Sequence, residues 1–193
     1  MKKSTIGLLA VIAVIAFWLI GVYNGMVGLD EGVNTAWANV ETQYQRRADL
    51  IPNLVNTVKG YAQHEQSTFE AVVNARSKAT SITVDPSNLT PEKLQEFQQA
   101  QGEITSALGR LIAISENYPD LKANEQFKEL QAQLEGTENR INVARTTFNK
   151  EAQKYNTTIR TFPRNLFAGM LGFTQRAYFE ADAGASQAPT VQF

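Results

Sequence analysis

The chain has 193 residues, with 18 basic and 19 acidic side chains and a formal net charge of −1. This length allows one domain with an appended segment, and the near-neutral charge provides no basic face for nucleic acid. Because there is no cysteine and only one histidine, the sequence excludes disulfides, thiolate metal sites, cysteine nucleophiles and multi-histidine metal sites within one chain.

The first predicted element is an apolar stretch near the N-terminus. Residues 6–22 read IGLLAVIAVIAFWLIGV, and roughly 17–25 residues of this kind span a bilayer core. The residues that follow offer no small-residue pattern for signal cleavage, so we favour an uncleaved anchor over a secretory signal. We therefore expect a short cytoplasmic N-terminus at 1–5 and a transmembrane helix at 6–27, with the lipid bilayer as its partner.

The charges that flank this stretch predict its orientation. Lys2 and Lys3 precede it, whereas Asp30 and Glu31 follow it and the next basic residue is Arg46. Basic residues beside a membrane span are enriched on the cytoplasmic side. The sequence thus predicts a single-pass protein of the cytoplasmic membrane whose bulk domain lies outside the cytoplasm.

The rest of the chain has the apolar period of helices. Apolar residues recur every three or four positions, and almost nothing alternates with a period of two. Thr90 followed by Pro91 is typical of a helix start, and the last long helix is expected to start near Asn124. The pairs 118–119 and 162–163, each an aromatic residue before proline, mark helix ends. We expect an all-α fold in which an antiparallel bundle of three long helices, with coiled-coil-like packing, occupies residues 28–163.

Pro52 falls within the first of these helices. A proline there removes one backbone hydrogen bond and costs about 3 kcal/mol. Either a kinked helix continues from Gly28 to Thr80, or the chain reverses at Pro52 and forms a four-helix up-and-down bundle. We favour the kinked helix because the apolar phase continues through the proline. The later helices would then be too short to cover its membrane-proximal half, which predicts a homo-oligomer that buries Val33, Trp37, Val40 and Tyr44.

Candidate interaction or architectural residues surround this proline. They are Arg46, Arg47, Asp49, Pro52, Lys59, Gly60, Tyr61, His64 and Glu65. Arg46 and Asp49 are three residues apart and can form a weak surface ion pair, or they can form a partner-docking patch with Arg47. Because Gly60 costs about 1 kcal/mol within a helix, we expect another helix to pack closely against it.

The sequence offers no catalytic constellation. His64-Glu65 lacks the second histidine of a zinc protease motif, and Gly169 and Gly172 flank aromatic residues instead of a phosphate-loop lysine. We therefore predict no enzymatic activity, no cofactor and no metal. The alternative is an enzyme whose site forms between subunits from His64, Glu65 or Glu116.

The C-terminal part begins with an amphipathic segment at 164–180. It can dock on the bundle, which we favour, or lie in the membrane interface, where it would act as a membrane-surface sensor. The small, polar residues 181–193 predict a disordered tail. The candidate membrane-interface residues, beside Arg164, are Leu166, Phe167, Met170, Leu171 and Phe173.

Motifs along the whole chain resemble those of a known family. They are Tyr23-Asn24, Ala36-Trp37, Val40, the run RRADLIPNLV at 46–55, the run TVKGYA at 57–62, His64-Glu65, Ala75-Arg76, Glu116, Tyr118-Pro119, Phe127, Glu138, Ile141, Arg145, Tyr155-Asn156, Phe162-Pro163 and Gly172-Phe173. With these residues the chain resembles the LemA family over nearly its whole length. Its one departure is Thr147-Phe148-Asn149, where a Tyr-Asn pair is expected.

The resemblance implies a bacterial, membrane-anchored helical bundle without an established reaction. The family is also described with its bulk domain in the cytoplasm, whereas the charges around the anchor favour the outside. We expect a non-catalytic scaffold or interaction protein of the bacterial envelope. It would act through self-association or by docking a partner, such as a membrane peptidase.

Overall fold

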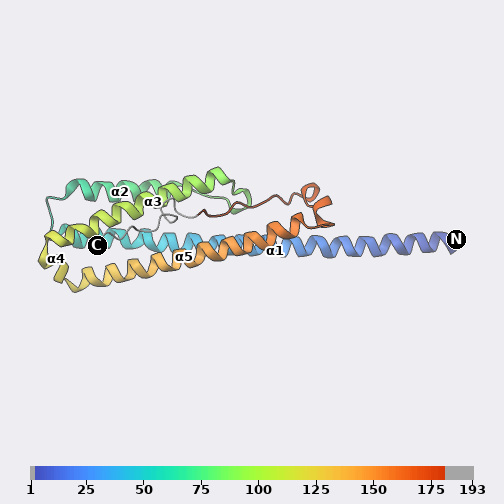
Figure 1. Cartoon of the computed structure of the whole chain (residues 1–193), viewed down its shortest axis with the longest axis horizontal. Coiled ribbons are helices and arrows are strands. Elements are labelled where there is room, and N and C mark those ends of the chain that lie inside the picture. The colour runs from blue at the N-terminus through green and yellow to red at the C-terminus, as the bar shows by residue number, and fades with distance from the viewer. Residues whose placement is uncertain (1–2, 181–193) are drawn as a thin grey trace, which may run out of the picture.

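The computed structural model describes residues 3–180, and within that range it is helical without any strand (Figure 1). The all-α prediction is thus confirmed. The tail predicted at 181–193 and the first two residues of the predicted N-terminus lie outside the described residues. The elements are α1 (Lys3–Lys59), α2 (Gln66–Ser81), η1 (Pro86–Asn88), α3 (Pro91–Ala113), η2 (Ile114–Asn117), α4 (Pro119–Ala123), α5 (Glu125–Arg160), η3 (Arg164–Leu166) and η4 (Gly169–Leu171).

Helix α1 has two different parts. It contains 57 residues and continues through Pro52. Its N-terminal part projects alone beyond the bundle (Figure 1), and ten of its large apolar side chains between Ile6 and Ile20 are 46–76% exposed. This part is long and apolar enough to cross a membrane. Burial by the rest of the chain begins near Val22, which is 8% exposed.

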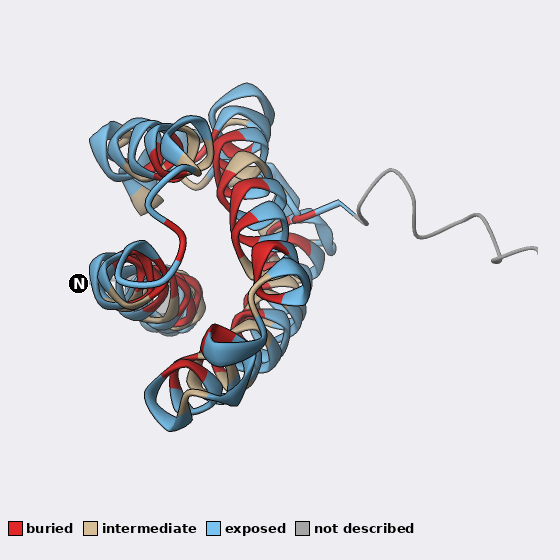
Figure 2. Ribbon diagram, turned by 90° about the vertical axis from the view of Figure 1, so that its left-hand side faces the viewer, coloured by how far each residue is buried: buried red, intermediate tan, exposed pale blue. Residues whose placement is uncertain are grey.

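The first helix ends at Lys59 instead of Thr80, so the described chain has four long helices instead of three. The chain reverses over Gly60–Glu65, not at Pro52, and α2 returns towards the membrane-proximal end (Figure 1). Seen end-on, α1, α2, α3 and α5 turn their buried faces inward (Figure 2). Buried Ala62 lies within the reversal and buried Phe69 follows it. Their spacing of seven residues has the same period as an unbroken helical stripe in the sequence.

Local caps fix the starts of α3 and α5. The Thr90 hydroxyl accepts a hydrogen bond from the Lys93 backbone N–H at 3.3 Å, and Asn124 Oδ1 accepts one from the Phe127 N–H at 2.8 Å. Both side chains satisfy backbone donors that have no partner within the first helical turn. The starts predicted at Pro91 and near Asn124 agree with these positions.

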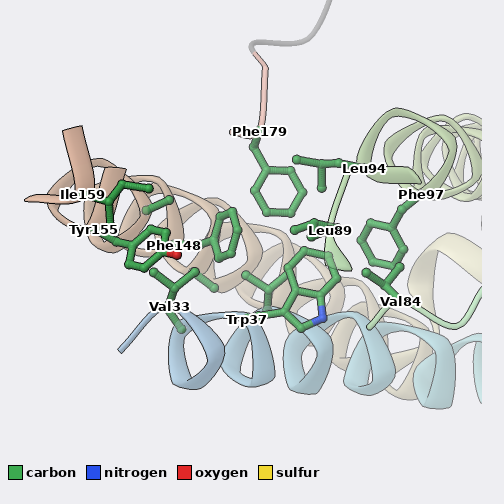
Figure 3. Close-up of a cluster of buried hydrophobic side chains, with 14 of the residues drawn as sticks. Val33, Trp37, Val84, Leu89, Leu94, Phe97, Phe148, Tyr155, Ile159 and Phe179 are labelled. Atoms are coloured by element: carbon green, nitrogen blue, oxygen red, sulfur yellow. The ribbon is translucent and has the colours of Figure 1, made fainter. Parts of the chain in front are cut away.

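The membrane-proximal core is built around aromatic rings. The Trp37 ring lies 5.4 Å from Phe97, 5.5 Å from Phe148 and 5.8 Å from Phe179, measured between ring centroids (Figure 3). The prediction that this half needs a second chain for burial is wrong, because α5, the loop before α3 and the C-terminal segment cover it. The four residues assigned to an oligomer contact, Val33, Trp37, Val40 and Tyr44, are at most 7% exposed within one chain.

The membrane-distal core is mainly aliphatic. It contains α1 residues from Ile51 onward, with the inner faces of α2, α3 and the first half of α5. Its most buried members include Leu54, Val58, Leu111 and Leu121. The two cores follow one another along the bundle axis, and a polar layer lies between them.

Candidate interaction site along the first helix

The candidate residues around Pro52 lie in three separate places. Arg46 and Asp49 are exposed on α1, Arg47 is inside the bundle, and residues 59–65 form the membrane-distal end of α1 and the turn after it. These places have different surroundings, so the residues do not form one site.

Arg47 is buried, with 1% of its surface exposed. Its Nη1 donates to Glu138 Oε1 at 2.8 Å and to Thr105 Oγ1 at 3.0 Å, and its Nη2 donates to both oxygens of Gln101. The guanidinium also lies 5.1 Å from the Tyr44 ring centroid. The alternative in which Arg47 joins a surface docking patch is wrong, because its position on the inner face of α1 directs it towards α3 and α5.

This network forms the polar layer between the two cores, defined here as Arg47, Gln101, Thr105 and Glu138. A buried cation requires partners in good geometry, because losing them leaves an uncompensated charge. The partners come from α3 and α5, so the layer fixes the register of three helices. Its chemical role is to position α1 against α3 and α5.

A second contact compensates for Pro52. Without a backbone N–H, Pro52 cannot donate to the Ala48 carbonyl four residues before it. Arg76 of α2 fills this gap, since its Nε donates to the Ala48 oxygen at 2.8 Å. The two motifs that the sequence analysis quoted separately, around Pro52 and at Ala75-Arg76, therefore meet in one contact between α1 and α2.

Arg46 and Asp49 line an open groove of about 1040 Å³ beside α1. The expected pair between them is absent, since Asp49 Oδ1 accepts a hydrogen bond from Gln45 Nε2 at 2.8 Å. The lining of the groove also includes buried Tyr44 and Phe97, together with residues from the end of α2 and the following loop. The groove thus combines an apolar floor with a rim that carries both signs of charge.

The distal turn joins α1 to α2 at the far end of the bundle. Tyr61 is 42% exposed, and its hydroxyl accepts a hydrogen bond from Asn124 Nδ2 at 2.9 Å. The Tyr118 hydroxyl donates to Glu65 Oε1 at 3.3 Å. Burial, followed by the negative charge of Glu65, raises the pKa of Tyr118. These bonds tie the turn to the segment between α3 and α5.

Close helix packing against Gly60 is not observed. Within 4 Å, an added Cβ would meet only the Thr57 and Asn56 carbonyl oxygens, which belong to the end of the same helix. Gly60 instead follows the last residue of α1, where a weak helix former allows the chain to turn. Our expectation of a neighbouring helix at this position is therefore wrong.

Glu65 and Glu116, considered above for an enzyme site between subunits, have different partners, which are Tyr118 for Glu65 and Lys122 for Glu116. His64 is exposed, and Glu116 is bound by Lys122 Nζ at 2.6 Å. Within residues 3–180 there is also no group of three or more histidine, aspartate or glutamate side chains that could hold a metal ion.

Asn149 and Asn156, which were quoted above only in the family resemblance and without a role, hold the C-terminal segment. The amide side chain of Asn156 makes both backbone hydrogen bonds of Arg176, and Asn149 does the same for Phe179, all at 2.8–3.0 Å. Asn149 and Asn156 are seven residues apart on a helix, and Arg176 and Phe179 are three residues apart on an extended segment. Both separations cover about 10 Å, so each asparagine lies opposite one of the two backbone positions. Besides the family resemblance, the sequence signal for this pair is their spacing of seven residues on one face of α5.

Arg176 adds a bond across the bundle. Its Nη2 lies 2.6 Å from Asp30 Oδ1, its Nη1 donates to the Pro86 carbonyl, and its guanidinium lies over the Tyr155 ring. Three elements distant in sequence therefore meet at this buried side chain. It closes the membrane-proximal core close to where α1 leaves the bundle.

Comparisons with known proteins identify the family of the chain. The family model for the LemA family matches residues 36–193. Magnetosome proteins MamQ 1 and MamQ 2 of Paramagnetospirillum magneticum are each 30% identical over 192 residues, which cover 91% of this chain and 70% of each relative. Protein LemA of Metamycoplasma hominis is 26% identical over 170 residues, covering 88% of this chain and 74% of the relative. The chain belongs to the LemA family.

Proposed function

We propose that this protein is a non-catalytic, membrane-anchored interaction protein of the bacterial envelope, and that it docks a partner in the groove beside α1. The observation that carries the proposal is the open groove of about 1040 Å³, lined by Arg46 and Asp49. Family membership and the apolar start of α1 support placement at a membrane.

The walls of the groove are held in place. Arg76 bonds α2 to the Ala48 carbonyl of α1, and Arg47 bonds α1 to α3 and α5. A binding surface that is already ordered loses less conformational entropy when its partner arrives. The buried arginine and the proline contact thus serve docking indirectly, by keeping α1 and α2 apart at a fixed spacing.

The shape and chemistry of the groove fit an amphipathic helix of a partner protein. Such a helix places an apolar face on the floor and polar residues against the rim. The groove lies about 35 Å along α1 from Tyr23, as calculated from the helical rise. A partner in the same membrane, such as a peptidase with a domain on this side, can reach that height.

Self-association remains a proposal with a different site. The membrane-proximal core is complete within one chain, so it supplies no reason for an oligomer. The groove is the surface where a second copy would bind, in competition with another partner. Crosslinking distinguishes the two, because a second copy gives a product of twice the mass.

We also propose that the bundle lies outside the cytoplasm. The fold returns Arg160 to the membrane-proximal end of the bundle. Arg160 lies far from the span in the sequence, however, so it does not enter the count of charges that flank the span. Lys2 and Lys3 decide that count. A phosphatase fused after Phe193 should therefore be active in the periplasm, and an inactive fusion with intact protein levels would reverse the orientation.

The docking proposal is tested by photocrosslinking in intact bacterial membranes. A photoreactive residue at Asn53, in the groove, should give a discrete crosslinked product. The same residue at Val143, which is 66% exposed on α5, serves as the control and should give none. Equal products from both positions, or none from Asn53, would contradict docking in the groove.

A further inference from the structure

The end of the bundle nearest to the anchor carries an exposed apolar tip. We define the tip as Phe162, Leu166, Met170 and Leu171, which are 74%, 57%, 86% and 46% exposed. They belong to the short turns η3 and η4 and to the residue pair that ends α5. Four large apolar side chains this exposed within ten residues form a patch that usually contacts another apolar surface.

The tip lies beside the anchor. The ring of Phe173, two residues after the tip, packs edge-on against Tyr23 of α1 with 5.6 Å between ring centroids. Figure 1 shows the turns after α5 alongside α1, at the level where its N-terminal part leaves the bundle. The exposed apolar residues of the tip therefore lie next to those of the anchor.

We propose that the tip inserts into the lipid interface as a second membrane contact beside α1. Trp18 and Tyr23, 46% and 43% exposed, lie on α1 near this level and have the ring type enriched at membrane interfaces. Exposed Arg160 and half-buried Arg164 lie next to the tip and can bind lipid phosphates. The nearest acidic residue of α1, Asp30, lies about 10 Å farther along the helix from Tyr23 and is paired with Arg176.

The structure also separates the five residues that the sequence marked for the membrane. Leu166, Met170 and Leu171 are exposed, whereas Phe167 is half-buried and Phe173 packs on Tyr23. The first three would enter the lipid, joined by Phe162, while the other two hold the tip against the bundle and α1. The proposed membrane contact thus has an exposed set of side chains that faces the lipid and a packed set that holds the tip in place.

A second membrane contact would restrict how the bundle is oriented relative to the bilayer. A single helix leaves the bundle free to rotate about the anchor and to tilt, whereas a second contact fixes which side faces the bilayer. The groove would then face a defined direction at a defined height. This inference rests on the membrane insertion of α1 in the proposed function, but not on the docking of a partner.

The test uses the full-length protein, which has no native cysteine. Single variants Met170→Cys, Ile12→Cys and Val143→Cys are labelled with an environment-sensitive fluorophore. Each is reconstituted into vesicles of phosphatidylethanolamine and phosphatidylglycerol. Quenching is measured with nitroxide lipids, which reach only membrane positions, and with iodide, which reaches only aqueous positions.

We expect the label at Met170 to behave like the label at Ile12. Its quenching by nitroxide lipids should be several-fold stronger than at Val143, and its quenching by iodide several-fold weaker. Aqueous behaviour at Met170 with lipid quenching at Ile12 overturns the second contact and leaves the anchor intact. Aqueous behaviour at both positions overturns both. Protection of Met170 from both quenchers shows that protein, such as a second copy, covers the tip, and also overturns the inference.

Discussion

The two cores of the bundle are completed in different ways. The distal core is closed by helices alone, mainly through aliphatic side chains. The proximal core is closed by the C-terminal segment, whose Phe179 joins the rings of Trp37 and Phe148. The half nearest to the membrane thus depends on residues that are synthesised last, while the distal half can assemble from neighbouring helices. We therefore predict that the polar layer separates two units of different stability.

The largest expected effect comes from breaking the aromatic core. Trp37→Ala should lower the free energy of unfolding by about 3–5 kcal/mol, because it removes a large, fully buried ring. In Trp37→Ala, hydrogen exchange should show reduced protection in the second half of α5, which packs in the proximal core. Protection of the helices in the distal core should change little. Leu111→Ala is the matched distal variant and should show the reverse pattern. Uniform loss of protection in both variants would mean that the bundle is one cooperative unit.

The next prediction concerns the boundary between the cores. Arg47→Met should cost about 1–3 kcal/mol, because it leaves acceptors on Gln101 and Thr105 without their donor. Its neighbour Arg46 is exposed, so Arg46→Met is the matched control and should change stability by less than about 0.5 kcal/mol. Chemical denaturation in detergent measures both. Equal effects would contradict the positioning role of the polar layer.

A smaller effect tests the contact between α1 and α2. Arg76→Met should cost about 1–2 kcal/mol, because the Ala48 carbonyl loses a charged donor. In a Pro52→Ala background, the backbone N–H of residue 52 can donate to this carbonyl. Arg76→Met should therefore lower the free energy of unfolding by less in that background. A double-mutant cycle measures the difference, and Arg110→Met, a change at an exposed arginine of α3, is the control. A cost of Arg76→Met that is the same in both backgrounds would show that Arg76 does not compensate for the proline.

The sequence predicted those features of the fold that depend on neighbouring residues. The starts of α3 and α5 follow from Thr90 and Asn124, whose side chains cap helices within three residues. The reversal after Lys59 was not predicted, because the apolar spacing on both sides of the turn remains in phase. Gly60 was recognised as unfavourable in a helix, but its position beyond the last residue of α1 depends on how α2 packs.

The site was predicted less well for the same reason. Arg47 has the same residue type as exposed Arg46, and its burial depends on acceptors 54–91 residues away. Asn149 and Asn156 are ordinary polar helix residues until a C-terminal backbone lies against them. Contacts between distant segments leave no local pattern in a sequence. A single sequence can therefore point to one residue of such a contact but not to the residue that it binds.

The smallest expected effect is a pH dependence confined to the proximal core. Burial, and next the negative charge of Asp30, raises the pKa of Tyr155 above its ordinary value of 10.0. The folded state therefore holds the Tyr155 proton to higher pH than the unfolded chain, so its contribution to stability is complete below pH about 10 and is lost as the pH rises further. Tyr155→Phe cannot ionise and should remove part of the alkaline loss of stability. Denaturation curves for both proteins between pH about 8 and 11 measure this, and equal slopes would show that Tyr155 does not titrate with unfolding of the proximal core.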